Sequence, residues 1–145
     1  MTLAGDYLVR DVEDGDQKSW AELYNAYREF YRVPADDESV ATTWAWMIGS
    51  EHGLRGIVAV DVHGPVKALA NLRLFARPSA GKTGFYLDDL FTAPTARGSG
   101  AASALLRRVA EIAEQEGATV VRWITAEDND TARPAIQRIG PNSAP

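Results

Sequence analysis

Apolar residues recur at helical spacing in two stretches of the first third of the chain. The segment Asp14–Asp16 precedes the first stretch and predicts a helix start, with an aspartate side chain capping the N-terminus. The second stretch begins at Asp36 or Asp37, and we expect Gly49 to end it. The apolar positions that define these helices are Trp20, Leu23, Tyr24, Tyr27 and Tyr31 in the first and Val40, Trp44, Met47 and Ile48 in the second.

Short apolar runs bounded by Gly, Pro and Asp predict β-strands on both sides of these helices. Three of the runs follow one another with only short turns between them, which predicts a three-stranded antiparallel meander. The predicted strands are Tyr7–Val12, Gly56–Val62, Val66–Phe75, Thr83–Thr92 and Thr119–Thr125.

The clearest amphipathic pattern, Leu105–Ala113, predicts a further helix with Gly117 just past its C-terminus. A small, glycine-rich segment, Arg97–Ala102, connects this helix to the strand before it. Asp130–Ile139 predicts a last short helix. The resulting order, β-α-α-β-β-β-α-β-α, predicts an α/β domain with a mixed, mostly antiparallel central sheet flanked by helices.

Composition narrows the classes of function. The 145 residues suit one domain, and we expect it to span 1–140 with 141–145 as a flexible tail. The 15 basic against 20 acidic residues give a net charge of −5, which argues against a general nucleic-acid binder. The absence of cysteine excludes disulfides, thiolate zinc sites and a cysteine nucleophile. With two histidines and no membrane-spanning run, we expect a cytoplasmic protein without a metal site.

Candidate chemistry lies in Phe85–Leu106. A glycine-rich turn from a strand into a helix leaves backbone N–H groups unpaired, and the helix dipole favours phosphate there. Arg97 can add a charge-assisted contact, while Gly98 and Gly100 let the backbone approach a ligand closely. The segment lacks the Lys-Ser/Thr of a Walker loop and the third glycine of a dinucleotide-binding loop. A plain glycine-rich connection is therefore the alternative interpretation.

Two runs of residues carry a family resemblance. Arg97-x-x-Gly100-x-Ala102 resembles the Q/R-x-x-G-x-G/A motif of the GNAT superfamily of N-acetyltransferases, which permits alanine in the last position. Tyr86–Phe91, YLDDLF, is similar to the Y-L-E-D-F/L-F stretch of the diamine (spermidine/spermine) and thialysine acetyltransferase branch. The resemblance extends over most of the chain and implies a GNAT-like fold.

The resemblance also implies an activity. An amine of a small molecule, polyamine or amino-acid-like, would directly attack the thioester of acetyl-CoA in a ternary complex. The pantetheine arm of acetyl-CoA would pair with strand backbone in a V-shaped opening between the strands ending at Thr92 and Thr125. An oxyanion would find its hydrogen-bond donor in the backbone near Leu90. The implied cofactor-binding residues are Leu90, Phe91, Thr92, Arg97, Gly98, Ser99, Gly100, Ala101, Ala102 and Asn129.

Asp88 occupies the position of the branch's glutamate, so it is the predicted catalytic base. It is one methylene shorter, which favours a bridging water. Neighbouring strand residues point to opposite faces unless a bulge intervenes. Asp89 would then share a face with Phe85, Leu87 and Phe91 and need a partner or a raised pKa. The alternative is that one aspartate is a structural acceptor and the other is solvated.

The aromatic first two helices cover the acceptor-amine site in the family. Tyr27 and Tyr31 are predicted to line that site together with Asp89, because a tyrosine hydroxyl prefers a wet environment. Packing in the core is the alternative for these tyrosines. His52 and His63 lie in predicted turns, and we expect both to be exposed residues without a role in the site.

The C-terminal region departs from the family pattern. The tyrosine that often protonates the leaving thiolate in the family is replaced by Ile136, and two expected strands after Gly140 have no counterpart. The sequence thus predicts a truncated C-terminal end and leaves a non-catalytic acyl-CoA-binding or regulatory module as the alternative function. An interaction domain without a cofactor is a third possibility. An open sheet edge predicts a homodimer, with no nucleic-acid or membrane partner.

Overall fold

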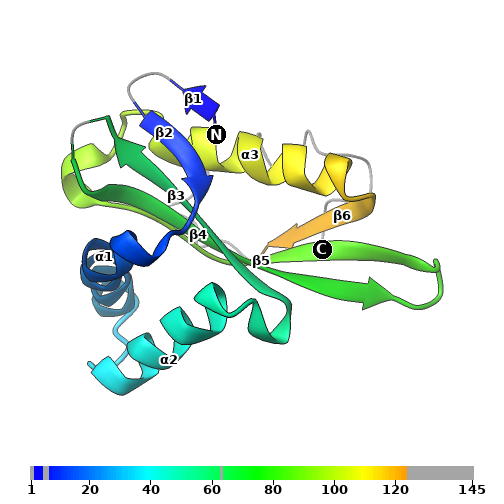
Figure 1. The fold of residues 1–145 in the computed structure, drawn as a ribbon, viewed down its shortest axis with the longest axis horizontal. Helices are drawn as coiled ribbons and strands as arrows, with labels where there is room; N and C mark the ends of the chain where they lie inside the picture. The colour runs from blue at the N-terminus through cyan, green and yellow to red at the C-terminus, as the bar shows by residue number, and fades with distance from the viewer. Residues whose placement is uncertain (1, 5–6, 63, 124–145) are drawn as a thin grey trace.

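A computed structural model of the chain describes residues 2–4, 7–62 and 64–123 (Figure 1). Six strands form one sheet whose spatial order follows the chain, and every neighbouring pair is antiparallel except the last, which is parallel. The mixed, mostly antiparallel sheet predicted from the sequence is therefore confirmed. The strands are β1 (Thr2–Ala4), β2 (Tyr7–Asp11), β3 (Leu54–Asp61), β4 (Val66–Arg77), β5 (Lys82–Thr92) and β6 (Ala118–Trp123).

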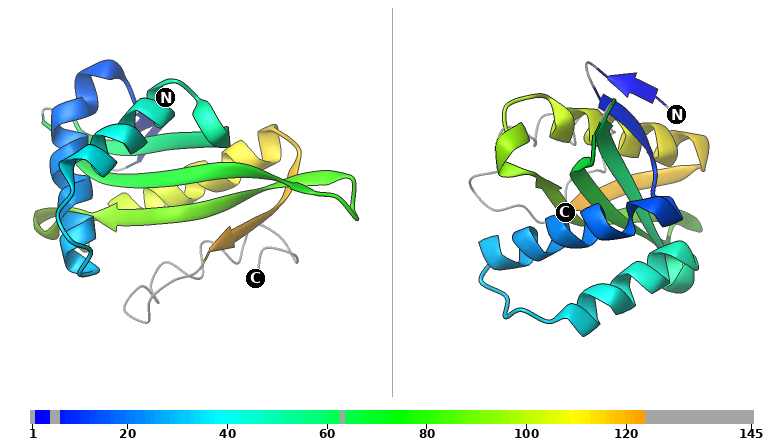
Figure 2. Two further views of the ribbon diagram at one scale, coloured as in Figure 1. Left: turned by 90° about the horizontal axis from the view of Figure 1, so that it is seen from below. Right: turned by 60° about the vertical axis from the view of Figure 1, so that its left-hand side comes forward.

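Helices cover both faces of this sheet. The views in Figure 1 and Figure 2 show two helices on one face and the third, longest helix on the other. None of the helices in the described ranges is long and apolar enough to span a membrane. The helices are α1 (Gln17–Phe30), α2 (Asp37–Ile48) and α3 (Ala101–Gln115), and the short 3-10 turns are η1 (Asp14–Asp16), η2 (Glu51–Gly53) and η3 (Pro94–Ala96).

Each face of the sheet carries its own apolar core. Ile57 and Val58 are adjacent on β3, and because strand side chains alternate, they enter different cores. The core under α3 is built from its apolar stripe, including Leu105, Leu106, Val109 and Ile112. The core under α1 and α2 contains Trp20, Leu23, Val40, Trp44, Met47, Leu69 and Phe91.

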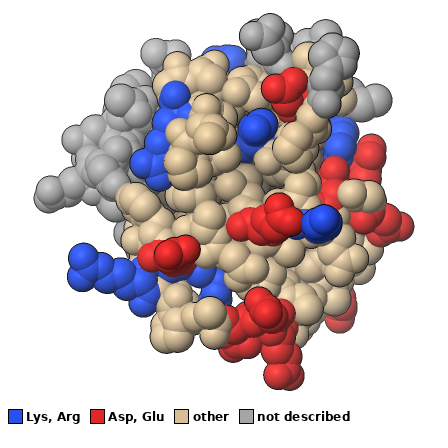
Figure 3. All heavy atoms as spheres, turned by 90° about the vertical axis from the view of Figure 1, so that its left-hand side faces the viewer, with Lys and Arg blue, Asp and Glu red and all other residues tan. Residues whose placement is uncertain are grey.

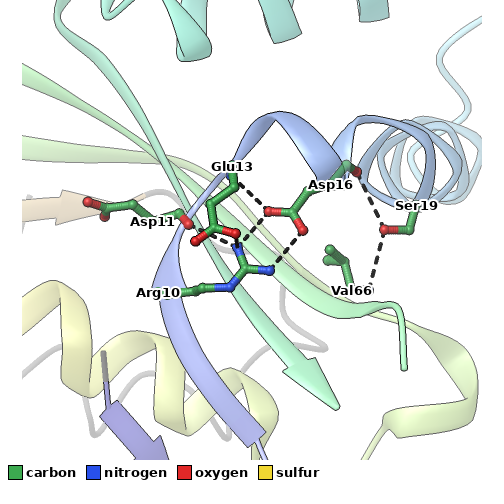
Figure 4. A network of polar contacts seen from close by, with 6 residues as sticks. All are labelled: Arg10, Asp11, Glu13, Asp16, Ser19 and Val66. Atoms are coloured by element: carbon green, nitrogen blue, oxygen red, sulfur yellow. Dashed lines mark hydrogen bonds and ion pairs between the residues drawn. The ribbon is translucent and has the colours of Figure 1, made fainter. Parts of the chain in front are cut away.

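A polar network fixes the entry into α1 (Figure 4). Arg10 donates to both carboxylate oxygens of Asp16, at 2.6 and 2.9 Å, and the backbone N–H of Glu13 donates to the same carboxylate at 2.9 Å. Burial opposes the charge of Asp16, but these hydrogen bonds hold its pKa below the usual value. Asp16 is the N-cap residue of α1, yet its side chain makes no capping hydrogen bond. The predicted aspartate cap is therefore wrong at α1, because the ion pair uses the carboxylate.

The other helix ends follow the sequence signals. The side chain of Asp36 accepts from the backbone N–H of Ser39 at 3.1 Å and caps α2, and Gly49 ends that helix. Gly117 follows α3 with a φ of +73°, as a left-handed residue past a helix C-terminus does. These local signals place α2 and α3 correctly because they depend on neighbouring residues alone.

Candidate functional site

The parallel strands β5 and β6 pair along only part of β5. Pairing runs from Thr83 with Ala118 to Leu87 with Trp123, and β5 then continues to Thr92. Residues 89–92 pair with β4 along one edge of β5, and along residues 88–92 the other edge has no strand partner in the described part of the chain. The predicted contact residues Leu90 and Thr92 lie in this stretch, whose second edge has no strand partner among the described residues.

The glycine loop leads from η3 into α3. Gly98 has a φ of +77° and Gly100 a φ of +91°, which side-chain-bearing residues rarely adopt. A Cβ on either glycine would meet nothing within 4 Å, so backbone conformation, rather than lack of space, requires glycine. The backbone N–H of Ser99 donates to the carbonyl of Ala96 at 3.2 Å. The N–H groups without a hydrogen-bond acceptor in the described protein include those of Gly98, Gly100, Ala101 and Ala102.

A hydrogen-bond chain fastens this loop to the sheet. The hydroxyl of Tyr7, on β2, donates to Ser99 Oγ at 2.8 Å, and Ser99 Oγ donates to the carbonyl of Ala96. The Ser99 hydroxyl proton is therefore used within the loop. A contact between positions 92 residues apart has no local sequence signal, which is why Tyr7 was not foreseen.

The Arg97 side chain packs against two aromatic rings, those of Phe30 and Phe91. Its guanidinium carbon is 5.3 Å from the ring centre of Phe30 and 5.7 Å from that of Phe91, within the range of cation–π contacts. These contacts connect the glycine loop to the C-terminal end of α1. A phosphate contact from the Arg97 side chain remains a prediction.

A β-bulge lies at the centre of the site. Asn71 of β4 pairs with Asp89, whereas the next residue, Leu72, pairs with Leu87, so Asp88 is the extra residue on β5. The alternation of faces therefore shifts at Asp88. Leu87 packs in the core under α3, whereas Asp89 bonds to α1 on the opposite face.

The expectation that Asp89 shares a face with Phe85 and Leu87 is therefore wrong. Both apolar residues belong to the core under α3, before the bulge. The part of the expectation that concerns Phe91 is correct, since Phe91 packs in the core under α1 and α2.

Both carboxylates line one cavity of about 370 Å³ between the sheet and the first two helices. The two aspartates and Arg73 give its lining one net negative charge, His52 left aside. The end view in Figure 3 shows acidic side chains mainly on the lower part, the side of α1 and α2. The net negative charge of the cavity lining itself favours a cation there. The polar and aromatic residues that line the cavity include Tyr24, Trp46, His52, Arg73, Asp88 and Asp89.

Asp89 is held by two donors. The hydroxyl of Tyr24 donates to Asp89 Oδ2 at 3.0 Å, and Nδ2 of the buried Asn71 donates to the same oxygen at 2.8 Å. The expectation that this carboxylate needs a partner is confirmed. Burial, and then the Asp89 charge, raise the pKa of Tyr24 and of Tyr27. The raised pKa fits the role of the Tyr24 hydroxyl as a donor to Asp89.

Asp88 is paired differently. Its Oδ2 accepts from Arg73 Nε at 2.8 Å, and Arg73 lies over the ring of Tyr86 at 4.7 Å. The hydrogen bond from Arg73 to Asp88 raises the pKa of the guanidinium. The Asp88 side chain keeps 29% of its surface exposed, so it combines a fixed direction with access to the cavity.

Of the two predicted acceptor-site tyrosines, Tyr27 lies about one helical turn and Tyr31 about two turns from Tyr24, which lines the cavity. Tyr27 stacks on Tyr24 at 5.5 Å, contacts Phe91 edge-on at 5.6 Å and lies 4.9 Å from Tyr31. Tyr24 lines the cavity, but Tyr27 and Tyr31 do not. Their contact with a substrate remains a prediction.

Several other expectations are not decided by this geometry. Asn129 and Ile136, and with them the expected last helix and C-terminal end, lie outside the described residues. No group of three or more histidine or carboxylate side chains that could hold a metal occurs in the described part of the chain. A larger cavity of about 480 Å³ contains the ion pairs of Arg55 with Asp11 and Glu116 and none of the predicted site residues.

Comparison with known proteins decides the family. Residues 20–140 match the Acetyltransferase (GNAT) family. The chain belongs to this family. Members of the family use acetyl-CoA as co-substrate, so the expected acetyltransferase class is confirmed at this level. The diamine and thialysine branch remains a prediction.

Two curated relatives are similar over most of the chain. The uncharacterized N-acetyltransferase YhfO of Bacillus subtilis is 27% identical over 132 residues, covering 91% of this chain and 87% of the relative. The D-amino-acid N-acetyltransferase HPA3 of Saccharomyces cerevisiae is 26% identical over 127 residues, covering 87% of this chain and 79% of the relative.

Solved structures share the fold of this GNAT chain. A probable acetyltransferase superposes with a TM-score of 0.81 at 22% identity, covering 92% of this chain and 88% of the other. An acetyltransferase of Trypanosoma brucei gives a TM-score of 0.72 at 22% identity, with 93% and 92% covered. The predicted GNAT-like fold is confirmed.

Proposed function

We propose that this GNAT protein transfers the acetyl group of acetyl-CoA directly to a primary amine of a small molecule in a ternary complex. The observation that carries the proposal is the bulge at Asp88. It turns a carboxylate into the acceptor cavity, beside a segment of β5 whose second edge has no strand partner in the described ranges. Residues 88–92 of β5 thus lie between the edge that would bind acetyl-CoA and the cavity lined by Asp88 and Asp89. This arrangement would bring a thioester and an amine close together.

The cofactor side would use backbone groups. The free N–H groups of the glycine loop suit a pyrophosphate at the start of α3, and Arg97 adds a positive charge nearby. The free edge at Leu90 and Thr92 suits the amides of a pantetheine arm, and backbone near Leu90 would stabilise an oxyanion. The bound acetyl-CoA supplies an activated acetyl group. The residues present therefore fit the co-substrate of the family.

The amine side would use the two aspartates differently. The ammonium first loses one proton to solvent. Asp88 then accepts a proton from the attacking neutral amine, directly or through one water, as the N–C bond forms and the C–S bond breaks, and CoA leaves as a thiolate that takes up a proton from water. Arg73 fixes the direction of Asp88 through their 2.8 Å hydrogen bond. Asp89 keeps its two donors and contributes negative potential, which draws an ammonium group into the cavity.

The charge of the cavity supports a cationic acceptor. Arg73, the arginine of the cavity lining, is paired with Asp88, so Asp89 leaves the lining with a net negative charge. The exposed ring of Trp46 offers an aromatic face that can bind a cation. A polyamine satisfies these features. The similarity to a D-amino-acid N-acetyltransferase keeps an amino-acid-like amine as the other acceptor of this proposal.

The test is release of free thiol from acetyl-CoA with a panel of primary amines. We expect amine-dependent release by the wild type and a loss of about 10²–10⁴ in kcat for Asp88→Asn, the usual contribution of a general base. Asp14→Asn is the matched control, because Asp14 is an exposed carboxylate in η1 outside the cavity. Both variants should still be stabilised by CoA. Full activity of Asp88→Asn would refute its role.

A second candidate is a non-catalytic acyl-CoA-binding module on the same fold. It is favoured by Ile136, which replaces the tyrosine that the family uses as an acid. This candidate predicts stabilisation by CoA of about 2.7 kcal/mol at a hundredfold excess over Kd, without turnover for any amine. It also predicts that Ile136→Tyr changes little. Thiol release above hydrolysis with any amine would exclude it.

A further inference from the structure

His52 has an unfavourable backbone conformation. Its φ of +57° and ψ of +24° are left-handed, which costs free energy for any residue with a side chain. Ser50, two residues earlier in the same connection between α2 and β3, is also left-handed, with a φ of +54°. Such conformations persist when surrounding structure holds them, and they cluster at functional sites. Two left-handed residues with side chains thus lie in one short connection, Ser50 and His52.

The two side chains lie at different cavities. His52 lines the acceptor cavity together with both aspartates, whereas Ser50 lines the larger cavity that holds none of the predicted site residues. The imidazole meets the ring of Trp46 edge-on, with centroids 4.9 Å apart and planes at 77°. Trp46 is 38% exposed and lines the same cavity. His52 and Trp46 thus form one aromatic wall of the acceptor cavity.

The imidazole has no hydrogen-bond partner within the described residues. The His52 side chain is exposed, so it contributes little packing free energy to the stability of the fold. The charged groups that share its cavity are Asp88, Asp89 and Arg73, and the Tyr24 hydroxyl is committed to Asp89. An imidazole nitrogen here can accept a hydrogen bond from a ligand N–H, and the face of Trp46 can hold a cation beside it.

We propose that His52 is a substrate-binding residue of the acceptor site. With Trp46 it holds a second nitrogen of the acceptor, away from the amine that is acetylated near Asp88. The acceptor class is therefore an amine that carries a further N–H donor several bonds from the reactive nitrogen. This assignment rests on the proposed acetyltransferase function and adds a subsite to it.

Two glycine variants separate binding from backbone strain. His52→Gly and Ser50→Gly both relieve a left-handed residue, so neither should lower the melting temperature by more than a few degrees. Kinetics are measured with acetyl-CoA and either spermidine or propylamine as acceptor. For His52→Gly we expect the KM for spermidine to rise about fivefold, the loss of one ordinary hydrogen bond. The KM values for propylamine and acetyl-CoA should not change.

Ser50→Gly should leave all three KM values unchanged. His52→Asn should restore most of the spermidine affinity, because asparagine tolerates the left-handed backbone and keeps a hydrogen-bond acceptor. An unchanged KM for spermidine in His52→Gly, or an equal rise in Ser50→Gly, would overturn the proposal while leaving the acetyltransferase function intact. No thiol release by the wild type with any amine would instead overturn the proposed function, and this subsite with it.

Discussion

The conformation of the glycine loop leads to a quantitative prediction for Gly100→Ala. The substitution adds one methyl group at a φ of +91°, where an added Cβ has nothing within 4 Å. The effect is therefore conformational and not a steric clash. A left-handed residue with a side chain costs about 1–2 kcal/mol, and a φ well beyond +57° favours the upper end of this range.

This conformational free energy lowers either the folding stability of the variant or its affinity for CoA. If the loop keeps its shape, the variant loses about 1–2 kcal/mol of folding stability. If the loop relaxes, CoA must restore its shape on binding, and the Kd rises by about 5- to 30-fold. The sum of the two losses is the quantity predicted. Urea denaturation gives the stability, and calorimetric titration with CoA gives the Kd.

Gly81→Ala is the matched control. Gly81 lies in the turn between β4 and β5 with a φ of +63°, and a Cβ there also meets nothing within 4 Å. Its substitution should lower stability by a similar amount and leave the Kd for CoA unchanged. The reasoning is refuted if Gly100→Ala alters neither quantity, or if Gly81→Ala weakens CoA binding as much.

Three further predictions concern the stability of the fold. Hydrogen bonds depress the pKa of Asp16 in the folded state. The ionised carboxylate therefore adds to the free energy of unfolding above the unfolded-state pKa of about 3.9, and this stabilisation is lost as the pH falls through the folded-state pKa. Urea midpoints should therefore fall more steeply below about pH 4 in the wild type than in Asp16→Asn. Gly84→Ala should destabilise by about 1–3 kcal/mol, because its Cβ would lie 2.6 Å from Val120 and 2.7 Å from Phe75; an unchanged urea midpoint would contradict the packing described. Leu105→Ala, in the core under α3, should lose about 2–5 kcal/mol by the same measurement, and a loss below 1 kcal/mol would show that the site is not close-packed.

The elements with strong local signals could be predicted from the sequence. The apolar stripe of α3 and the glycine after it depend only on neighbouring residues, and so do the turns that separate β3, β4 and β5. Gly98 and Gly100 marked the glycine loop for the same reason, since a left-handed backbone has a residue preference of its own. β1 was missed because its three residues are too short for a pattern.

The bulge could be named as a possibility but not located from the sequence. It is defined by the register of β5 against β4, where Asn71 faces Asp89 and the next pair skips Asp88. One extra residue changes which face every later side chain occupies. The faces assigned to Asp89 and its neighbours were therefore partly wrong.

The choice among the tyrosines also required the structure. Helical spacing places Tyr24, Tyr27 and Tyr31 on one side of α1, but the angle of the helix on the sheet decides which of them reaches the cavity. Asp89 lies 65 residues from Tyr24 in the chain, so no local pattern indicates their hydrogen bond. His52 was expected in an exposed turn, which is correct, but its place in the cavity wall depends on the packing of α2.

The most direct test of the central claim is detection of the acetylated acceptor itself. The wild-type protein is incubated with acetyl-CoA and spermidine or a panel of other primary amines, and the small molecules are identified by mass spectrometry. Acetyltransfer beside Asp88 predicts an N-acetylated amine that accumulates in step with free CoA and is nearly absent with Asp88→Asn. Binding of CoA without any acetylated amine across the panel would contradict the account.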